Sequence, residues 1–327
     1  MKNINLKNII LPSLLTIFYL ASTHLIFGQD VRLKEAREQF KQKNYQKVIT
    51  LLEHQSSINQ PTLTLLGKAY FQLNQPKQAI TYLEQATQSG TKNAELQYWL
   101  GMAHFAILRS NIPFNKKGYY AHRVKKAFKA ALQLDSTHIQ ARKELARYYL
   151  NAPRIAGGSV AKAKKHAKIL QKYDKLIGYH LEATIHIKTK AYNQAKKIYL
   201  DLIKASLADK TTYYWLSEIG LRSKDFGQAF HYCQQSIVKY PDYLIGYYQY
   251  AKVASQAHKN IVEGIRYAQW YLRKDPENKV SPGNHWVYYR LGVLYQMQGN
   301  RVNAQQAFQK ALEIHPDFKQ AKKALRN

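Results

Sequence analysis

The residues able to do chemistry are scattered along this chain of 327 residues. Its 12 histidines and 20 acidic residues follow no spacing typical of a metal site or an acid–base pair. His180 and His186 lie six residues apart, on different faces of a helix. No H-E-x-x-H, G-x-S-x-G or C-x-x-C motif occurs. We therefore expect no catalytic residues, no metal ligands and no cofactor.

The clearest chemical signal is positive charge. The chain has 50 Lys and Arg against 20 Asp and Glu, a formal net charge of +30. Residues 113–175 alone contain 16 cations and three acids, which gives 16 − 3 = +13. Such a charge attracts an acidic protein, a lipid surface or an anionic envelope polymer, and salt screens that attraction. No nucleic-acid-binding signature occurs, so nucleic acid is the least favoured anionic partner.

A glycine pair followed by a serine and a run of lysines marks a candidate anion site within this basic stretch. Ser159 is suited to cap a helix, and the free amides at a helix N-terminus attract anions. The competing interpretation is a glycine turn, a serine cap and a solvated lysine face. The candidate anion-binding residues are Ser159, Lys162, Lys164, Lys165 and Lys168.

The elements that position these residues repeat along the chain. A small residue recurs eight times at intervals of 31 to 45 residues, where two helices are expected to touch. These residues are Ala36, Gly67, Gly101, Ala146, Ala183, Ser217, Ala251 and Gly292. Cys233 falls in a mostly apolar column of the partner helix, so we expect a buried, unreactive thiol. His104 and His186 share a column with tyrosines and are interpreted as packing residues.

By pattern and residue identity, the chain resembles the tetratricopeptide repeat (TPR) family over roughly residues 30–327. The resemblance implies an all-α fold: a right-handed α-solenoid of about eight helix pairs over residues 29–327, with a C-terminal capping helix. Insertions near residues 106–120 and 151–159 lengthen the third and fourth repeats, and we expect them to form loops. The resemblance also implies a non-enzymatic scaffold for protein–protein interaction, with the first helix of each pair lining a concave groove.

The family pattern assigns residues to that groove by their position in the first helix of each repeat. Tyrosine suits a contact surface because it offers a rigid ring and one polar tip. The chain has 26 tyrosines, however, so chance placement is the competing interpretation. The expected groove residues are Tyr98, Lys143, Arg147, His180, Tyr214, Tyr248, Lys252 and Tyr289. Lys143 and Arg147, one turn apart, are suited to pair with a carboxylate or phosphate of an acidic or extended protein segment.

Residues 1–28 resemble an export signal. Lys2 and Lys7 precede an apolar stretch over residues 9–27, and the small Gly28 precedes Gln29. The apolar stretch is also nearly long enough to span a bilayer, so an uncleaved N-terminal anchor is the alternative. Both interpretations place the protein outside the cytoplasm, in the periplasm or cell envelope.

Overall fold

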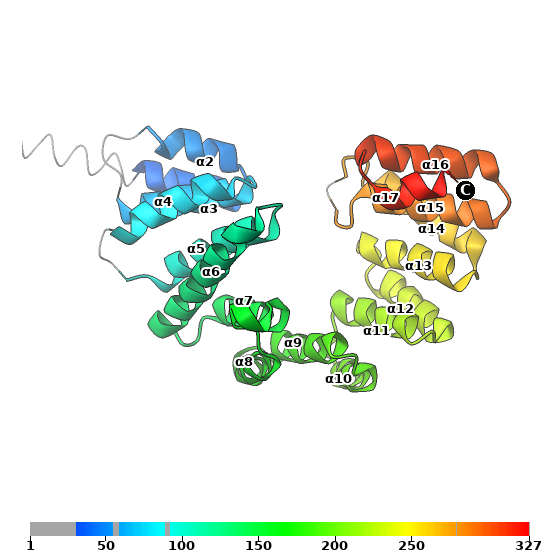
Figure 1. The fold of residues 1–327 in the computed structure, drawn as a ribbon, viewed down its shortest axis with the longest axis horizontal. Helices are drawn as coiled ribbons and strands as arrows, with labels where there is room; N and C mark the ends of the chain where they lie inside the picture. The colour runs from blue at the N-terminus through cyan, green and yellow to red at the C-terminus, as the bar shows by residue number, and fades with distance from the viewer. Residues whose placement is uncertain (1–30, 55–58, 89–91, 279, 327) are drawn as a thin grey trace, which may run out of the picture. The chain divides into compact units, whose positions relative to one another are not determined.

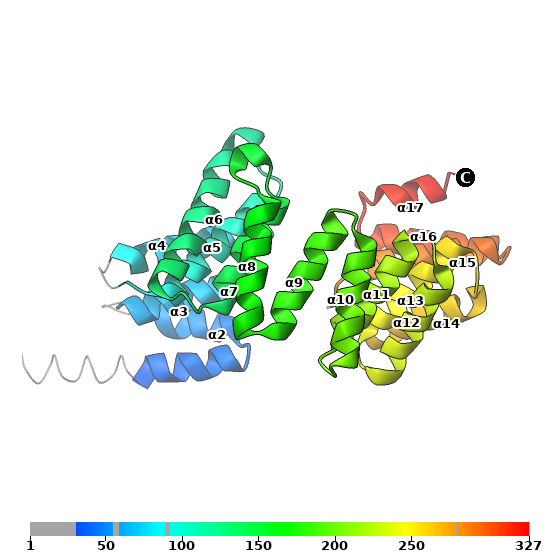
Figure 2. The same ribbon diagram turned by 90° about the horizontal axis from the view of Figure 1, so that it is seen from below.

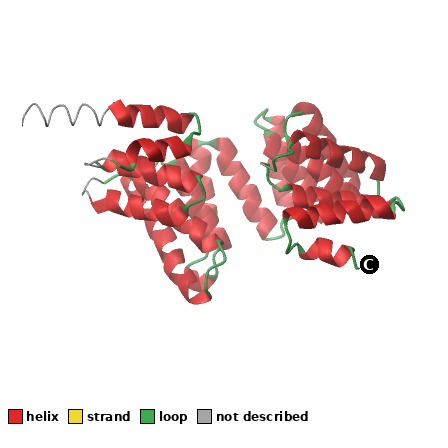
Figure 3. Cartoon of the chain, turned by 90° about the horizontal axis from the view of Figure 1, so that it is seen from above, coloured by secondary structure: helices red, strands yellow, loops and turns green. Residues whose placement is uncertain are grey.

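A computed structural model describes residues 31–54, 59–88, 92–278 and 280–326. Helices and the turns between them make up this described part, which contains no strand (Figure 3). The sequence-based export signal over residues 1–28 lies outside it. Of the helices described, none combines the length and apolar character needed to cross a membrane.

The described helices form two compact units that divide between His166 and Ala167. In the first unit, residues 31–41 are helical and are followed by α2 (Tyr45–Leu52), α3 (Gln60–Gln72), α4 (Pro76–Gln88), α5 (Ala94–Arg109), α6 (Phe114–Leu134), α7 (Ile139–Asn151), the short 3₁₀ helix η1 (Arg154–Ala156) and the start of α8 (Val160–Tyr173). The second unit holds the rest of α8, then α9 (Lys175–Lys188), α10 (Tyr192–Lys204), α11 (Lys210–Arg222), α12 (Phe226–Lys239), α13 (Leu244–Ala257), α14 (Ile261–Lys274), α15 (Asn284–Met297), α16 (Arg301–Ile314) and α17 (Lys319–Ala324).

Within each unit, consecutive helices pack as pairs and the pairs stack in chain order (Figures 1 and 2). Six such pairs pack closely among the helices described, namely α3–α4, α5–α6, α9–α10, α11–α12, α13–α14 and α15–α16. Helix α17 packs on the last of them through the buried Phe318 and Ala321. The predicted all-α solenoid with a capping helix is therefore confirmed. The handedness expected from the family resemblance remains a prediction.

The first helix of most pairs begins at a side chain that caps it. The side chains of Asn59, Asn93, Asp174 and Asp209 each accept a hydrogen bond from the backbone N–H three residues further on. A capping oxygen satisfies one of the backbone donors that a helix start leaves unpaired. These short polar residues therefore fix where helices α3, α5, α9 and α11 begin.

Four of the turns within pairs share one geometry. Lys43, Asn74, Lys190 and Gly299 have positive φ values of 63°, 58°, 61° and 83°. In each turn the next residue donates its backbone N–H to the carbonyl five positions earlier, at 2.8–2.9 Å. A left-handed residue with this back-bond ends a helix and satisfies its last carbonyls. The chain thus reverses the same way before α2, α4, α10 and α16.

The column of small residues lies where the two helices of a pair touch. At Gly101, an added Cβ would lie 2.6 Å from the ring of Phe128, and at Gly292 it would lie 2.5 Å from the ring of Phe308. Both rings are buried, at 0% and 2% exposure. The glycines therefore allow α5 to approach α6, and α15 to approach α16, with a phenylalanine closing each contact.

Cys233 occupies the corresponding position on α12. It is 1% exposed, and its Sγ lies 3.0 Å from Ser217 Oγ on α11. Burial raises the pKa of the Cys233 thiol to about 12, so it stays protonated at neutral pH. The prediction that this cysteine is a packing residue is confirmed.

The insertion near residues 106–120 is mostly helical, not the expected loop. Helix α5 continues to Arg109 and α6 begins at Phe114, so only residues 110–113 lie outside helices. Pro113 allows this because a proline at a helix start lacks only a donor that would be unpaired there. By contrast, residues 152–159 do form a turn around η1, in which a side chain at Gly158 would clash with the carbonyl of Ala152.

Replacing Gly101 and Gly118 with alanine should have opposite effects on stability. Gly101→Ala places a methyl group too close to the Phe128 ring and should lower the free energy of unfolding by about 1 kcal/mol. Gly118 lies within α6 and an added Cβ would meet nothing within 4 Å. Gly118→Ala should therefore raise stability by about 0.5–1 kcal/mol. Thermal unfolding of both variants checks this, and equal shifts in the same direction would contradict the close-contact account.

Candidate functional site

In the second unit, helices α11, α13 and α15 lie side by side and carry four of the expected groove residues (Figure 2). Tyr214 is on α11, Tyr248 and Lys252 are on α13, and Tyr289 is on α15. We call the surface formed by these residues together with Glu218, Arg222 and Arg290 the α11–α13–α15 face. It is the candidate site that the structure defines in most detail.

A buried carboxylate organises the centre of this face. Glu218 is 5% exposed and accepts hydrogen bonds from Lys252 Nζ at 2.6 Å, Arg222 Nε at 2.9 Å and Gln249 Nε2 at 3.0 Å. Burial alone would raise the pKa of the Glu218 carboxyl, but these partners, Lys252 foremost, hold it below its usual value. Glu218 is therefore ionised at neutral pH, and it fixes two cations from neighbouring repeats.

The two cations differ in how much of their side chain a ligand can reach. The side chain of Lys252 is 18% exposed, whereas that of Arg222 is 45% exposed. A guanidinium carries five N–H donors, and the bond to Glu218 uses the one on Nε. Arg222 is thus the more accessible cation, and Lys252 mainly joins α13 to α11.

The three tyrosines of the face are not equivalent. Tyr248 is 8% exposed and belongs to the core of the second unit, whereas Tyr214 and Tyr289 are partly exposed. Burial, followed by the nearby Glu218, raises the pKa of the Tyr214 hydroxyl. Only Tyr214 and Tyr289 therefore present ring surface for contact, and Tyr248 supports the face from beneath.

Arg290 adds a third cation beside Tyr289. Its guanidinium carbon lies 5.3 Å from the centre of the Tyr289 ring, and its Nη1 lies 3.4 Å from Ser255 Oγ on α13. Cation–π contact of this kind holds an arginine flat against an aromatic ring. The face therefore combines three cations with one carboxylate.

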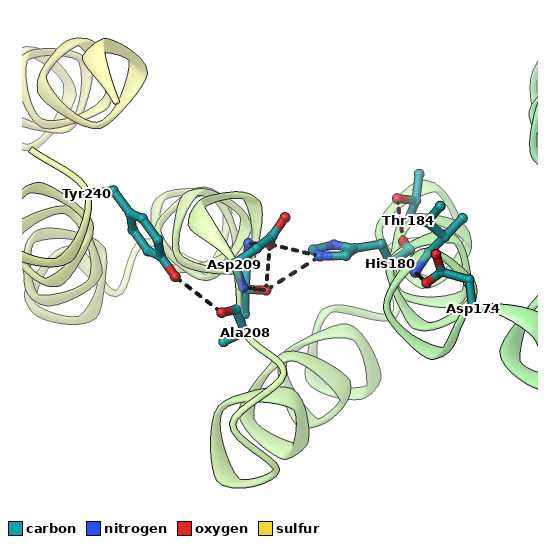
Figure 4. A network of polar contacts seen from close by, with 8 residues as sticks. Asp174, His180, Thr184, Ala208, Asp209 and Tyr240 are labelled. Carbon is teal, nitrogen blue, oxygen red and sulfur yellow. Dashed lines mark hydrogen bonds and ion pairs between the residues drawn. The ribbon is translucent and has the colours of Figure 1, made fainter. Parts of the chain in front are cut away.

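His180 lies on α9 and is tied to the start of α11. Figure 4 shows its ring facing Asp209, with 3.0 Å between Nε2 and Asp209 Oδ1. The same oxygen accepts the backbone N–H of Thr212 at 2.9 Å, which caps α11. Although burial opposes it, His180 and Thr212 hold the pKa of the Asp209 carboxyl well below its usual range. His180 thus links two repeats and has one ring nitrogen engaged by the protein itself.

In the first unit, the predicted Lys143–Arg147 pair surrounds another buried carboxylate. Glu144 is 4% exposed, with Arg147 Nη1 at 3.0 Å and Lys143 Nζ at 3.9 Å from its Oε1. Tyr98 is partly exposed, and its ring centre lies 5.1 Å from that of His138. Burial, then the charge of Glu144, raises the pKa of Tyr98 to about 12. The two cations therefore already share one acid.

The sequence-based choice of groove residues leaves out Glu144, Glu218, Arg222 and Arg290. A signal for the carboxylates exists, because acids are scarce and these two stand beside the small-residue column at Ala146 and Ser217. Arg222 follows Glu218 by four residues, which is the spacing of a helical ion pair, whereas Arg290 carries no comparable signal among 50 cations. The role of Arg290 depends on which side chains the neighbouring repeat brings to it.

The candidate anion-binding residues lie around the start of α8 and along it. Ser159 caps the helix, because its Oγ accepts the backbone N–H of Lys162 at 3.3 Å. Lys162, Lys164, Lys165 and Lys168 are exposed, and Lys162 Nζ lies 5.5 Å from the centre of the Tyr149 ring. The cap agrees with the sequence, and anion binding there remains a prediction.

Metal ligands are not assembled in the part of the chain that the structure describes. No three His, Cys, Asp or Glu side chains of that part are placed together as metal ligands. His104 is 2% exposed and its ring centre lies 6.0 Å from that of Tyr120, but neither of its ring nitrogens has a hydrogen-bond partner among the described residues.

Two segments match tetratricopeptide repeat family models, residues 64–107 and residues 285–318. A solved tetratricopeptide repeat protein from Parabacteroides merdae is 14% identical, with a TM-score of 0.55 over 82% of this chain and 97% of that one. The chain therefore contains TPR repeats. A second solved structure, the APC/C hetero-tetramer Cut9–Hcn1, is 12% identical with a TM-score of 0.54 over 91% of this chain and 55% of that one. No curated protein sequence matches the chain significantly.

TPR repeats generally form non-enzymatic scaffolds that mediate protein–protein interaction. At 14% and 12% identity, the two solved structures show the fold of this chain and nothing of its partner. The residues that distinguish it are therefore those on its own surfaces.

Replacing Glu218 with glutamine should destabilise the second unit. The change leaves Lys252 and Arg222 without their carboxylate, which we expect to cost about 3 kcal/mol. Because the folded pKa of Glu218 lies below that of the unfolded chain, its stabilisation is present above a pH of about 4.5 and is lost as the pH falls further. The variant should therefore unfold more easily at neutral pH and lose part of this acid dependence. Thermal unfolding across pH checks both effects, with Glu263→Gln on the exposed side of α14 as control.

Proposed function

We propose that this TPR protein is a scaffold that binds an acidic, extended segment of a partner protein across the α11–α13–α15 face. The observation that carries the proposal is that this face holds three cations and one buried carboxylate, which pairs with only two of them. Arg222, Lys252 and Arg290 exceed Glu218 by two charges. A partner carboxylate would complete the pairing that the protein leaves unbalanced.

The aromatic residues support a peptide as the occupant. Tyr214 and Tyr289 lie on α11 and α15, on either side of α13, and each offers a partly exposed ring and a hydroxyl. Rigid rings give contact area at low entropic cost, and the hydroxyls suit the polar backbone of an extended chain. An extended segment spans about 3.3 Å per residue, so a short stretch reaches across neighbouring helices.

The second candidate is docking on an anionic surface through the lysines of α8. Lys162, Lys164, Lys165 and Lys168 are exposed and have no carboxylate within ion-pair distance among the described residues. Such a contact would be dominated by charge and would weaken steeply with salt. We favour the α11–α13–α15 face because it combines charge with ordered aromatic surface.

A photo-crosslinking residue should trap a partner from the α11–α13–α15 face and not from the opposite helices. We expect adducts in the native cells when the crosslinker replaces Tyr214 or Tyr289. The matched controls are Val238 on α12 and Val302 on α16, which belong to the same repeats and are 79% and 65% exposed. Replacing Arg222 and Arg290 with glutamine should reduce the adduct at least about tenfold, the effect of losing 1.4 kcal/mol of binding.

The outcome also separates the two candidate functions. If neutralising the four α8 lysines removes the adduct while the Arg222 and Arg290 changes do not, docking through α8 is favoured. Equal adducts from Val238 and Tyr214 would exclude a contact specific to this face. The folded state of each variant is checked by its thermal unfolding midpoint.

We further propose that the protein works outside the cytoplasm, after cleavage of residues 1–28. The support is the positively charged start followed by an apolar stretch and Gly28. N-terminal sequencing of the mature protein should begin at Gln29. A sequence that begins at Met1 in the membrane fraction would instead indicate an uncleaved anchor.

A further inference from the structure

A pocket of about 440 Å³ lies among helices α4, α5 and α6 of the first unit. Its volume falls in the range of small-molecule sites, which is about 300–1,000 Å³. Its apolar lining residues are Leu100 on α5 with Ala127 and Ala130 on α6. The two alanines are small, so they leave space that a larger side chain on α6 would fill.

A buried histidine with unmet hydrogen-bonding capacity lines this pocket. His104 is 2% exposed, and no described residue makes a hydrogen bond with either of its ring nitrogens. The nearest carboxylate oxygen, Glu84 Oε1, is 3.9 Å from Nε2, which is too far for a hydrogen bond. Buried polar groups nearly always have a partner. His104 therefore points to a ligand with groups that donate and accept.

Burial, followed by the charge of Arg123, lowers the pKa of His104 to about 4. The ring is thus neutral at pH 7 and offers one N–H donor and one acceptor. A hydroxyl group matches this combination because it also donates and accepts. The side-chain amides of Gln88 and Gln97, which line the same pocket, offer the same pair of functions.

Two cations at the pocket supply a site for negative charge. Arg123 donates Nη2 to Glu84 at 3.0 Å and Nε to the hydroxyl of Tyr119 at 3.1 Å. These bonds hold the guanidinium in place and leave its Nη1 without an acceptor among the residues described. Lys126 lines the pocket one turn along α6 and forms no ion pair within the described part of the chain. With Glu84 counted, the lining carries a net charge of +1.

We propose that this pocket binds a small polyhydroxylated carboxylate, of the chemical class of a uronic acid. The carboxylate would pair with Arg123 and Lys126, since a planar guanidinium suits a carboxylate. The hydroxyl groups would exchange hydrogen bonds with His104, Gln97 and Glu84. The apolar face of the sugar ring would lie against Leu100, Ala127 and Ala130.

Replacing His104 with leucine should affect stability and ligand binding in opposite directions. His104→Leu removes a buried polar group that has no partner in the protein, so the unliganded fold should be as stable as before or more stable. The same change should weaken ligand binding at least tenfold. A residue that only packs would show the reverse, with some loss of stability and no change in binding.

The test uses the full-length protein with ¹⁵N-labelled histidine and D-glucuronate as the probe. Glucuronate should shift the ring resonances of His104, and calorimetry should detect saturable binding. D-glucose, which lacks the carboxylate, and glutarate, which lacks the hydroxyls, should each bind at least tenfold more weakly. Arg123→Gln should abolish the preference for glucuronate over glucose, and Lys129→Gln, an exposed change on α6 outside the pocket, should leave it unchanged.

Several results would overturn the proposal. They are unshifted His104 resonances at saturating glucuronate, equal binding of glucuronate and glucose, and wild-type binding by both the His104→Leu and Arg123→Gln variants. Binding of inorganic phosphate without glucuronate would overturn the assignment to a carboxylate. If none of the probes changes the His104 ring resonances from their values in buffer alone, the pocket is filled by solvent and the proposal is wrong.

Discussion

The close contact between the two helices of a repeat is the constraint on which the rest of this structure depends. At Gly101 and Gly292, a phenylalanine from the second helix occupies the place where any side chain would stand. This contact sets the spacing of the helices and therefore the direction of every side chain that leaves them. In a repeat protein each unit packs mainly on its neighbours, so such contacts replace a single central core.

Polar contacts between repeats then set the position of one pair relative to the next. His180 reaches Asp209 at the cap of the following first helix, and Lys252 reaches back to Glu218. Both carboxylates carry depressed pKa values, because their partners outweigh the effect of burial. The link between Lys252 and Glu218 thus both joins two repeats and fixes charged groups of the α11–α13–α15 face.

The sequence predicts what a single repeat determines, and much less of what depends on neighbouring repeats. The small-residue column, the buried Cys233 and the C-terminal capping helix follow from spacing within one repeat, and all three are confirmed. Tyr214 and Tyr248 occupy equivalent positions, yet only Tyr248 is buried, because burial depends on the packing of adjacent repeats. The helical form of residues 114–120 and the pocket beside His104 also depend on how α6 packs, which the repeat pattern does not encode.

The positions of the few acidic residues determine where the excess positive charge of the chain lies. With 20 acids against 50 cations, each carboxylate can neutralise only part of its surroundings. Glu144 and Glu218 are buried beneath two cations each, so a cation remains in excess at the surface on both units. A buried carboxylate holds its cations in fixed positions, and an ordered cation loses less entropy on binding an anion than a mobile one. The buried carboxylates therefore order cations that they do not fully neutralise, and these cations are available at the surface to bind an anionic partner.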